Sequence, residues 1–288
     1  MHLLLLTPDP AFPEPFAWAF HVEAEALRAA GAEVASRPWT AVGDVSPFDL
    51  VLPLVAWGYH LRYAEWLALL DRFEAEATPV INPPAVLRWN SDKAYLAGLG
   101  AAGVPTVPTL EVDHLNEAAL AAAFRTLGTD EVVVKPPVSA GASGTFRLRE
   151  GEGAHVPMEV HGERMMIQPF LPSISGTGEY SLILFGGEIS HCVVKRPKAG
   201  DFRVQPNFGG ETVACEPPAG AVELARAALA QAPAEAVYAR VDMVVGIDGA
   251  LQIIELELIE PALFLHCAEQ AKPRFAAAII STAERASK

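Results

Sequence analysis

The chain has 288 residues, of which 51% are hydrophobic, and a formal net charge of −14 at pH 7. That length accommodates two or three domains with real cores, whereas the apolar run Leu3 to Leu6 is too short for a membrane span or a signal peptide, so we expect a cytoplasmic protein. Binding to nucleic acid or to an anionic membrane depends on neutralising phosphates with Lys and Arg, so the negative charge argues against both partners.

Strands and helices alternate through the first third of the chain. Apolar runs at residues 2–6, 33–37 and 50–55 predict strands, and periodic stretches at 17–30 and 63–75 predict helices. Gly31 is placed to end the first helix. The alternation predicts a small open α/β domain with a parallel sheet, whose end lies near residues 78–84.

The remaining two thirds contain further strands and helices. A Pro-rich stretch at residues 104–108 precedes a predicted helix at 116–126 and a strand at 131–134, which ends at Lys135-Pro136-Pro137 because proline cannot donate to the ladder. Predicted helices at 220–232 and 267–285 flank a hairpin. From these elements we predict three domains, at residues 1–84, 85–167 and 168–288.

The cysteines give no sign of a disulfide framework. Cys192, Cys215 and Cys267 are far apart, odd in number and without C-x-x-C spacing. This spacing is also unsuited to a zinc site. We therefore predict buried, reduced thiols.

Residues 237–261, VYARVDMVVGIDGALQIIELELIEP, are the most informative segment. Alternating apolar residues on either side of Asp248-Gly249 predict two antiparallel strands joined by a two-residue turn, with Ile247 facing Ala250. Counting outward from that turn places Asp242 directly opposite Glu255. Two residues farther from the turn on each strand, the same register places Arg240 opposite another carboxylate.

That second carboxylate is Glu257, which shares one face of its strand with Glu255 because side chains alternate along a strand. The residues predicted on the other face are Ile254, Leu256 and Leu258. Neighbouring like charges destabilise a sheet unless a cation neutralises them, and oxygen ligands favour a hard ion such as Mg²⁺ or Mn²⁺. We predict that Asp242, Glu255 and Glu257 hold metal; the alternative is a solvated acidic face on an edge hairpin.

Two features upstream are suited to nucleotide phosphates. In the loop at residues 139–145, SAGASGT, glycines allow backbone N–H groups to approach phosphate oxygens, and hydroxyls add donors. The loop has neither the P-loop nor the Rossmann spacing and fails the nucleophile-elbow pattern, so a hairpin tip is the alternative. Lys93 and Lys135 could hold phosphates as point charges, although most lysines are merely solvated.

Two more segments suggest how a purine and a developing negative charge are held. Residues 165–171, MMIQPFL, predict a strand that runs into a linker able to face a purine, with an ordinary buried strand as the alternative. The basic run at 195–203, KRPKAGDFR, precedes NFGG at 207–210 and predicts a loop that clamps negative charge, with a solvated face as the alternative. Glu179 lies between them and is a candidate for a ribose hydroxyl.

Taken in order, these segments resemble an ATP-grasp ligase of the glutathione synthetase and ribosomal-protein S6 glutamate ligase type. The resemblance covers residues 82–261, through NPPAVLRWNSDKAYLAGLGAAGVPTVPT, VVVKPPVSAGASGT, MMIQPFL, VVKRPKAGDFRVQPNFGG and VDMVVGIDGALQIIELELIEP. It depends on their order, since no single segment is specific. The resemblance implies a mixed α/β and α+β class: an ATP-grasp fold with an N-terminal open α/β domain and two α+β subdomains clasping ATP.

The resemblance also implies site residues. Those implied for ATP are Lys93, Lys135, Ser139, Gly141, Ser143, Gly144, Gln168, Phe170, Leu171 and Glu179. Those implied for the transferred phosphoryl group or the acyl phosphate are Lys195, Arg196 and Arg203. Two Mg²⁺ (or Mn²⁺) ions are implied at Asp242, Glu255 and position 257. Most of these ligases have Asn in an E-x-N motif at that last position, whereas this chain has Glu257, which adds a negative charge.

The reaction implied is ATP-dependent activation of a carboxylate as an acyl phosphate, which an amine then attacks with release of ADP and phosphate. Both substrates are expected to be small molecules, and a homodimer or homotetramer is left open. One alternative is an intramolecular cyclo-ligase of the cycloserine-forming type. Another is a non-catalytic ATP-binding regulatory module, although such a module could lose the metal triad or the basic loop without penalty.

Two segments are expected at the substrate pocket. Residues 57–60, WGYH, follow an N-terminal strand, and ligands in open α/β sheets bind beyond the carboxyl ends of the strands. Residues 260–264, EPALF, come just after the predicted metal strand. For Trp57 a role in core packing is an equal alternative.

Overall fold

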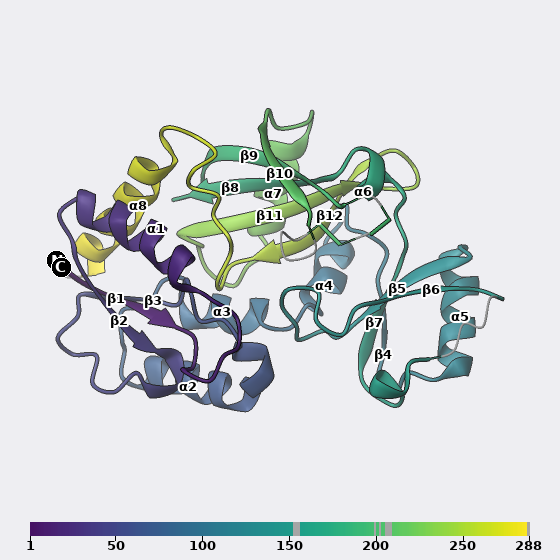
Figure 1. Cartoon of the computed structure of the whole chain (residues 1–288), viewed down its shortest axis with the longest axis horizontal. Helices are drawn as coiled ribbons and strands as arrows, with labels where there is room; N and C mark the ends of the chain where they lie inside the picture. Colours follow the sequence, from purple (N-terminus) through teal and green to yellow (C-terminus); the bar gives the residue numbers. More distant parts are fainter. Residues whose placement is uncertain (152–155, 199, 202, 205–208, 287–288) are drawn as a thin grey trace.

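The computed structural model describes residues 1–151, 156–198, 200–201, 203–204 and 209–286. The chain forms three sheets, one in each successive region (Figure 1). No helix of the described residues is long and apolar enough to cross a membrane.

The N-terminal region is the parallel α/β unit that the sequence predicts. Its sheet has the order β2-β1-β3, and its elements are β1 (His2–Thr7), α1 (Ala17–Ala29), β2 (Glu33–Pro38), η1 (Trp39–Ala41), β3 (Leu50–Leu52), η2 (Tyr59–Arg62) and α2 (Tyr63–Ala75). Leu3 and Leu5 pack in the core beneath α1, whereas Leu4 and Leu6 pack in the core beneath α2. Helices therefore cover both faces of the sheet, which explains why β1 is a continuous apolar run rather than an alternating one.

The central region is an antiparallel sheet of order β4-β7-β5-β6 with one covering helix (Figure 1). Its elements are α3 (Pro84–Asn90), α4 (Tyr95–Ala101), β4 (Leu110–Val112), α5 (Glu117–Leu127), β5 (Glu131–Lys135), β6 (Phe146–Arg149), η3 (Met158–Val160) and β7 (Met165–Pro169). Asn116 caps α5, because its Oδ1 accepts the N–H of Ala119 at 3.0 Å. Residues 167/168, the predicted second domain boundary, lie inside β7.

The C-terminal region is a five-stranded antiparallel sheet of order β10-β9-β8-β11-β12. Its elements are α6 (Ser173–Gly176), β8 (Glu179–Phe185), β9 (Glu188–Arg196), β10 (Glu211–Cys215), α7 (Ala221–Leu229), β11 (Tyr238–Val245), β12 (Leu251–Glu257) and α8 (Ala271–Ala286). One face packs against α7 in a continuous apolar core. The other face is apolar at the end where Ile183 and Tyr238 meet Phe275 of α8. It is apolar again at Val244, which packs with Leu171, and charged side chains lie between these two ends.

The β11–β12 hairpin differs from the prediction at its turn. Gly246 donates its N–H to Ala250 O at 2.8 Å, so three residues form the loop instead of two, and Gly249 has a φ of +80°. The predicted pairing of Ile247 with Ala250 is therefore wrong. A Gly at this position adopts the left-handed conformation without a steric cost, which favours the longer loop.

A β-bulge restores the predicted register at the carboxylates. Between Asp242 and Met243 the register shifts by one residue, so Met243 faces Ile253 while Asp242 faces Glu255 as predicted. The bulge inverts the alternation along β12. In consequence Ile253 joins the main core, whereas Ile254, predicted on that face, packs in a small separate cluster.

Asn82 connects the N-terminal region to the five-stranded sheet. Its amide, completely buried, donates to Tyr238 O at 2.9 Å and Leu258 O at 2.7 Å, and its Oδ1 accepts the N–H of Val237 at 2.7 Å. One side chain thus binds the start of β11 and the chain just after β12. These bonds hold the two strands together at the end nearest the N-terminal region.

We predict that Asn82→Ala lowers the free energy of unfolding by about 3 kcal/mol or more, since it leaves buried backbone groups without partners. Urea unfolding followed by circular dichroism measures this. Asn116→Ala, which removes only the cap of α5, is the control and should cost about 1 kcal/mol. Equal losses in the two variants would contradict the role of Asn82.

Candidate active site

The three predicted metal-binding carboxylates lie together on the charged face of the sheet. One oxygen atom from each of Asp242, Glu255 and Glu257 lies within 4.8 Å of the others. Asp242 is fully buried, and the two glutamates are half-buried. Asp242 is therefore not part of a solvated face, whereas the two glutamates keep part of their surface exposed. A compact set of carboxylate oxygens suits a hard divalent ion such as Mg²⁺.

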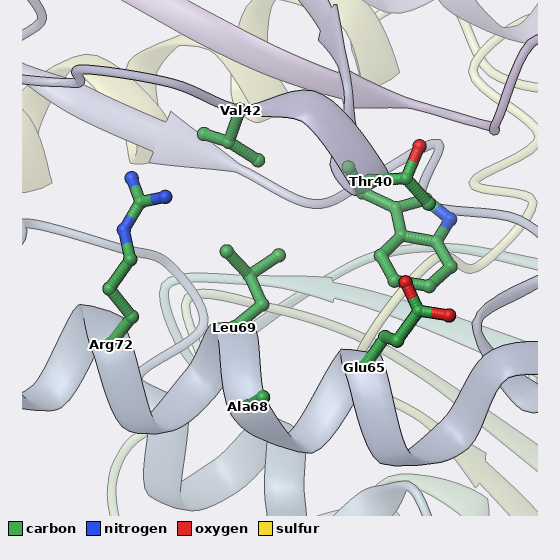
Figure 2. Close-up of a pocket in the computed structure, with 7 residues that line it drawn as sticks. Thr40, Val42, Glu65, Ala68, Leu69 and Arg72 are labelled. Carbon is green, nitrogen blue, oxygen red and sulfur yellow. The ribbon is translucent and has the colours of Figure 1, made fainter.

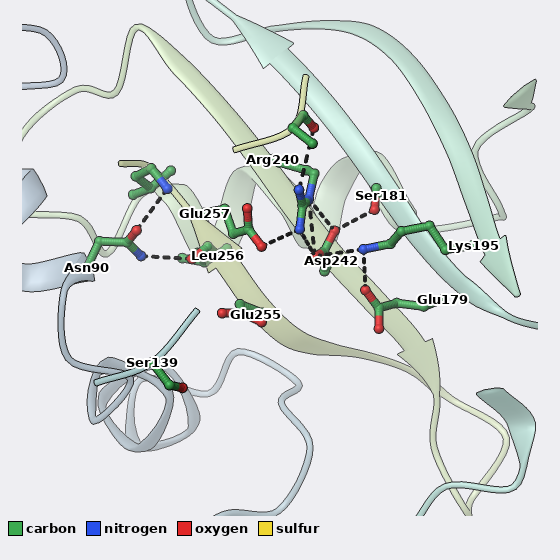
Figure 3. A network of polar contacts seen from close by, with 12 residues as sticks. Asn90, Ser139, Glu179, Ser181, Lys195, Arg240, Asp242, Glu255, Leu256 and Glu257 are labelled. Carbon is green, nitrogen blue, oxygen red and sulfur yellow. Dashed lines mark hydrogen bonds and ion pairs between the residues drawn. The ribbon is translucent and has the colours of Figure 1, made fainter. Parts of the chain in front are cut away.

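Side chains from α3 and α4 hold the free edge of β12. Asn90 donates to Leu256 O at 2.9 Å and accepts from the N–H of Leu258 at 2.8 Å (Figure 3). The hydroxyl of Tyr95 bonds both backbone groups of Leu256. These contacts replace a neighbouring strand, so the backbone that carries Glu255 and Glu257 is paired on both sides.

Two buried cations compensate the charge of Asp242. Arg240 binds both oxygens of Asp242 through Nε and also binds Glu257, while Lys195 Nζ lies 3.1 Å from Asp242 Oδ2 and 2.5 Å from Glu179 Oε1 (Figure 3). Although burial alone would raise it, Arg240 and Lys195 hold the pKa of Asp242 well below its usual value. Asp242 is therefore ionised before any metal binds.

The pKa values of three other acids of the site are raised, whereas that of Asp242 is lowered. Burial raises the pKa of Glu257 to about 7, with Arg240 opposing the shift. Burial, together with the charge of Glu257, raises the pKa of Glu260 to about 8. Burial also raises the pKa of Glu179 despite its ion pair with Lys195. Desolvation disfavours each negative charge, and a bound cation would reverse this preference.

Lys93 joins the acidic cluster to the small-residue loop. Its Nζ lies 3.3 Å from Glu255 Oε1 and donates to Ser139 O at 2.5 Å, and its backbone N–H bonds Pro137 O at 2.9 Å. The loop connects β5 to β6, and at Gly144 a Cβ would lie only 2.9 Å from Pro136. The fold thus places the predicted phosphate-binding residues in a loop that Lys93 anchors at the carboxylate cluster: Ser139, Gly141, Ser143 and Gly144.

Lys135 is buried at the end of β5, so the expectation of a merely solvated lysine is wrong for both lysines. No hydrogen bond or ion pair joins its Nζ to any other residue that the structure describes. Burial lowers the pKa of Lys135, with the charge of Glu255 opposing the shift. An ammonium held in a largely buried side chain without a bonded partner costs free energy, which a bound anion would offset.

The predicted adenine segment joins the central and C-terminal sheets. Gln168 is buried in β7 and donates through Nε2 to Thr109 Oγ1 at 2.9 Å, so its side chain is occupied within the protein. The Arg147 guanidinium lies 3.6 Å from the centre of the Phe170 ring. Leu171 is buried in the small cluster that contains Ile254. The segment is therefore a packed connection between the two sheets.

The basic run lies only partly in the described residues. The side chain of Lys195 is buried in the site, whereas Arg196, the last residue of β9, is exposed. Arg203 NH2 pairs with Asp201 at 2.8 Å. Ala199, Phe202, Asn207 and Phe208 of the predicted loop lie outside the described residues. Of the three predicted cations, the described structure brings Lys195 into contact with the carboxylates.

The charged groups of the site act on two residues of the N-terminal region. Burial raises the pKa of Tyr59 strongly, and the charges of Glu260, Glu255 and Glu257 add to the shift. Burial lowers the pKa of His60 to about 4, with the charge of Lys93 adding to it. The other predicted substrate segment contacts the cluster through Ala262 O, which accepts from Arg240 at 3.4 Å.

Trp57 has a packing role. It contacts Trp18 at 5.7 Å between ring centres, and its carbonyl accepts from Trp39 Nε1 at 3.2 Å. The ring also packs against the core beneath α1. These contacts support the packing alternative for this residue.

Figure 2 shows a hollow of about 300 Å³ elsewhere, between η1 and α2. It is lined by Trp39, Thr40, Val42, Glu65, Ala68, Leu69 and Arg72. The charged side chains there are already bonded: Arg72 donates to Gly43 O at 2.6 Å, and Glu65 pairs with Arg62 at 2.5 Å. A binding site needs polar groups that converge on a ligand, so the acidic cluster is the better candidate.

Sequence reasoning missed four members of the site. Arg240 was identified only as a register partner, although its R-x-D spacing opposite E-x-E was a usable signal. Ser181 donates to Asp242 Oδ1 at 2.5 Å, and Asn90 and Tyr95 bind the edge of β12. Nothing in the local sequence marks these three, because the partner of each is more than 60 residues away.

Comparison with known proteins agrees with this geometry. The family profile described as prokaryotic glutathione synthetase, ATP-grasp domain, matches residues 107–270, and the profile described as D-cycloserine synthetase DcsG, N-terminal domain, matches residues 4–82. The cycloserine biosynthesis protein DcsG of Streptomyces lavendulae is 32% identical over 275 residues, which cover 88% of this chain and 90% of that protein. The glutathione synthetase of Ralstonia nicotianae is 26% identical over 262 residues, 86% of this chain and 76% of its own.

Solved structures extend the likeness to the whole fold. The crystal structure of D-cycloserine synthetase DcsG matches with a TM-score of 0.83 and 31% identity, covering 99% of this chain and 100% of that one. The D-alanine–D-alanine ligase of Bacillus anthracis, at 18% identity, has a TM-score of 0.71 over 99% of this chain and 98% of its own, which shows a shared fold.

The fold and the site together define an ATP-dependent ligase. The chain belongs to the ATP-grasp ligase family, in the neighbourhood of glutathione synthetase and DcsG. The expected fold class, the enzyme class and the ligase reaction are thereby confirmed. Ligases of this family use ATP and divalent metal ions, and their substrates include small molecules.

We predict that Arg240→Gln lowers the free energy of unfolding of the metal-free protein by about 3–5 kcal/mol, because it leaves Asp242 buried without its bidentate partner. Chemical unfolding in the presence of a chelator measures the loss. Arg226→Gln is the control: it breaks an exposed pair with Glu188 and should cost about 1 kcal/mol or less. A loss no larger than the control's would show that Arg240 is not needed to compensate Asp242.

Proposed function

We propose that this ligase binds ATP and Mg²⁺ at the cluster of Asp242, Glu255 and Glu257 and closes a ring within one amino-acid-like substrate. The observation that carries the proposal is the continuous similarity to D-cycloserine synthetase DcsG, which includes the N-terminal residues 4–82. The charges of the glutamates act on Tyr59 of that region, and the charge of Lys93 acts on His60, so both residues would border a substrate bound at the carboxylate cluster. The substrate assignment therefore rests on residues 4–82, which lie outside the matched ATP-grasp domain at residues 107–270.

Bound Mg²⁺ would neutralise the phosphates of ATP and the charge that moves with the transferred phosphoryl group. The carboxylates of the cluster would hold the ion, since their oxygens form a donor set that suits it. Lys93 and Lys135 would bind ATP phosphates, and residues 139–145 would lie over them. Lys195, with Arg196 and Arg203, would stabilise the acyl phosphate, because fixed cations favour charge that develops during the reaction.

The nucleotide base and ribose would be held by the segment between the sheets. Gln168, Phe170 and Leu171 would border the adenine, mainly through backbone groups, because the Gln168 side chain already bonds Thr109. Glu179 would accept from a ribose hydroxyl. Its carboxylate keeps one oxygen beyond the one that meets Lys195.

Glu260 suits the amine of the substrate. Among the described residues its carboxylate has no bonded partner, and it directly follows the metal strand. With a pKa raised to about 8, it could accept a proton from an attacking nitrogen near neutral pH. In a cyclisation the nitrogen and the carboxylate belong to one molecule, so both ends of that molecule must fit between Glu260 and the metal cluster.

The function is tested with the linear aminooxy amino acid obtained by opening the ring amide of D-cycloserine. With MgATP we expect ADP release without a second amine, and a product whose mass equals that of the substrate minus water. A panel of other carboxylates, each with and without separate amines, tests the intermolecular alternative. ADP release that requires a separate amine, with a product that combines both compounds, would replace cyclisation by ligation of two substrates.

The metal assignment predicts different outcomes at the two glutamates of β12. Glu255→Gln should abolish ADP release while the fold is kept, because it removes one charge from the ligand set. Glu257→Asn should retain part of the activity, since Asn also offers an oxygen and is the usual family residue at this position. Steady-state kinetics with circular dichroism measures both. Full activity of a folded Glu255→Gln protein would refute the metal site.

The phosphate role of Lys135 predicts a loss of affinity without a loss of stability. Lys135→Met should weaken ATP binding about tenfold or more, since a charge-assisted hydrogen bond contributes about 1.5–3 kcal/mol. The free energy of unfolding should not fall, because the variant removes a buried ammonium without a bonded partner. Calorimetric titration with MgATP measures the first and urea unfolding the second. Lys272→Met, at an exposed pair with Glu25, is the control.

A further inference from the structure

Two of the three cysteines are brought together by the β9–β10 hairpin. Cys192 and Cys215 face each other directly in the antiparallel register, and their Sγ atoms are 3.5 Å apart. Both are free thiols, as is Cys267 in another part of the fold. The proposed reaction uses neither thiol of the pair.

The geometry of the pair suits a covalent link. Residues that face each other on antiparallel strands have Cα atoms about 4.5–5.5 Å apart, which falls inside the range of about 4.4–6.8 Å found for disulfides. An S–S bond of about 2.05 Å requires the two Sγ atoms, now 3.5 Å apart, to approach by about 1.5 Å. Rotation of the two side chains supplies much of this movement, because the backbones are already in register.

We propose that Cys192 and Cys215 form an oxidation site that takes a peroxide and becomes a cross-strand disulfide. Hydrogen peroxide first converts the Cys215 thiol to a sulfenic acid, with release of one water. The Cys192 sulfur then attacks the Cys215 sulfur, the S–O bond breaks, and the hydroxyl leaves with the Cys192 proton as a second water. Two thiols and one peroxide thus give one disulfide and two waters, and two electrons pass from sulfur to the peroxide.

Burial decides which thiol reacts first. Cys192 is 3% exposed, whereas Cys215 is half-buried and accessible from the edge of the sheet. Burial, with the neighbouring Cys215, also raises the pKa of the Cys192 thiol, which keeps it protonated. Since oxidation follows exposure and thiolate character, Cys215 is the residue attacked and Cys192 the one that resolves the sulfenic acid.

The link would act on the strand that carries Lys195. In the described part of the chain β10 pairs with β9 alone, so a disulfide would restrain an edge strand. Lys195 lies three residues beyond Cys192 on β9, and its carbonyl packs closely against Gly178, where a Cβ would lie 2.7 Å from Lys195 O. A shift of β9 toward β10 would therefore change the contacts of Lys195 with Glu179 and Asp242.

The test treats the full-length protein with hydrogen peroxide, blocks remaining thiols, and maps peptides by mass spectrometry without reductant. We expect a peptide pair linked through Cys192 and Cys215 that is lighter by two hydrogens and is separated by dithiothreitol. Amide hydrogen exchange of β10 should slow in the oxidised protein. Cys267→Ser should behave like the parent, whereas Cys215→Ser should give no linked pair. Oxidation of Cys215 to a sulfinic acid without linkage would overturn the proposal.

The effect on turnover is measured separately and depends on the proposed function. ADP release should fall about tenfold or more on oxidation and return with dithiothreitol, because displacement of a catalytic group by about 1 Å can cost up to about 10²-fold. An equal fall in the Cys215→Ser protein, or unchanged turnover in the linked protein, would disprove the coupling to Lys195. The linked peptides and the hydrogen exchange need no substrate, so they stand even if the ring-closing function fails. If Cys215→Ser does not fold, Cys192→Ala serves the same comparison.

Discussion

The structure of the site depends on one buried carboxylate. Asp242 is 1% exposed on β11 of the five-stranded C-terminal sheet, and its charge is tolerated only because Arg240, Lys195 and Ser181 bind its oxygens. Burying an ion is costly unless nearly all of its hydrogen-bonding capacity is used. The partners come from β8, β9 and β11 itself, so three adjacent strands must keep their register for this charge to remain in the protein.

The need to hold Asp242 and its partners in place explains why the face that carries them has both an apolar part and a charged part. At one end the sheet is apolar and covered by α8 and α1, which fix its position against the N-terminal region (Figure 1). The charged part of the face needs no such cover, because its side chains form hydrogen bonds and ion pairs with one another. Apolar packing fixes the position of the sheet, and the fixed charges of the polar part form a preorganised electrostatic environment.

The residues proposed to bind the nucleotide are cations that the fold likewise holds in place. Lys93 meets Glu255 and the loop at Ser139, whereas Lys135 is buried close by without a bonded partner among the described residues. Cations held in place before the ligand arrives need little reorganisation when phosphates bind. The unfavourable burial of Lys135 is thus a cost in the free protein that ligand binding can offset.

The sequence alone predicted the parallel N-terminal unit and the pairing of Asp242 with Glu255, because both depend on periodicities that extend over a few residues. The turn of the same hairpin was mispredicted, yet the register at Asp242 held, since a bulge compensates the longer loop. Only the tertiary structure decided that Asn90 and Tyr95 bind the edge of β12 and that Cys192 meets Cys215. These contacts join residues distant in the chain, and no local pattern encodes them. The burial of Lys135 could not be predicted from the sequence either, because the solvent exposure of a side chain is set by the elements that pack around it and not by its neighbours in sequence.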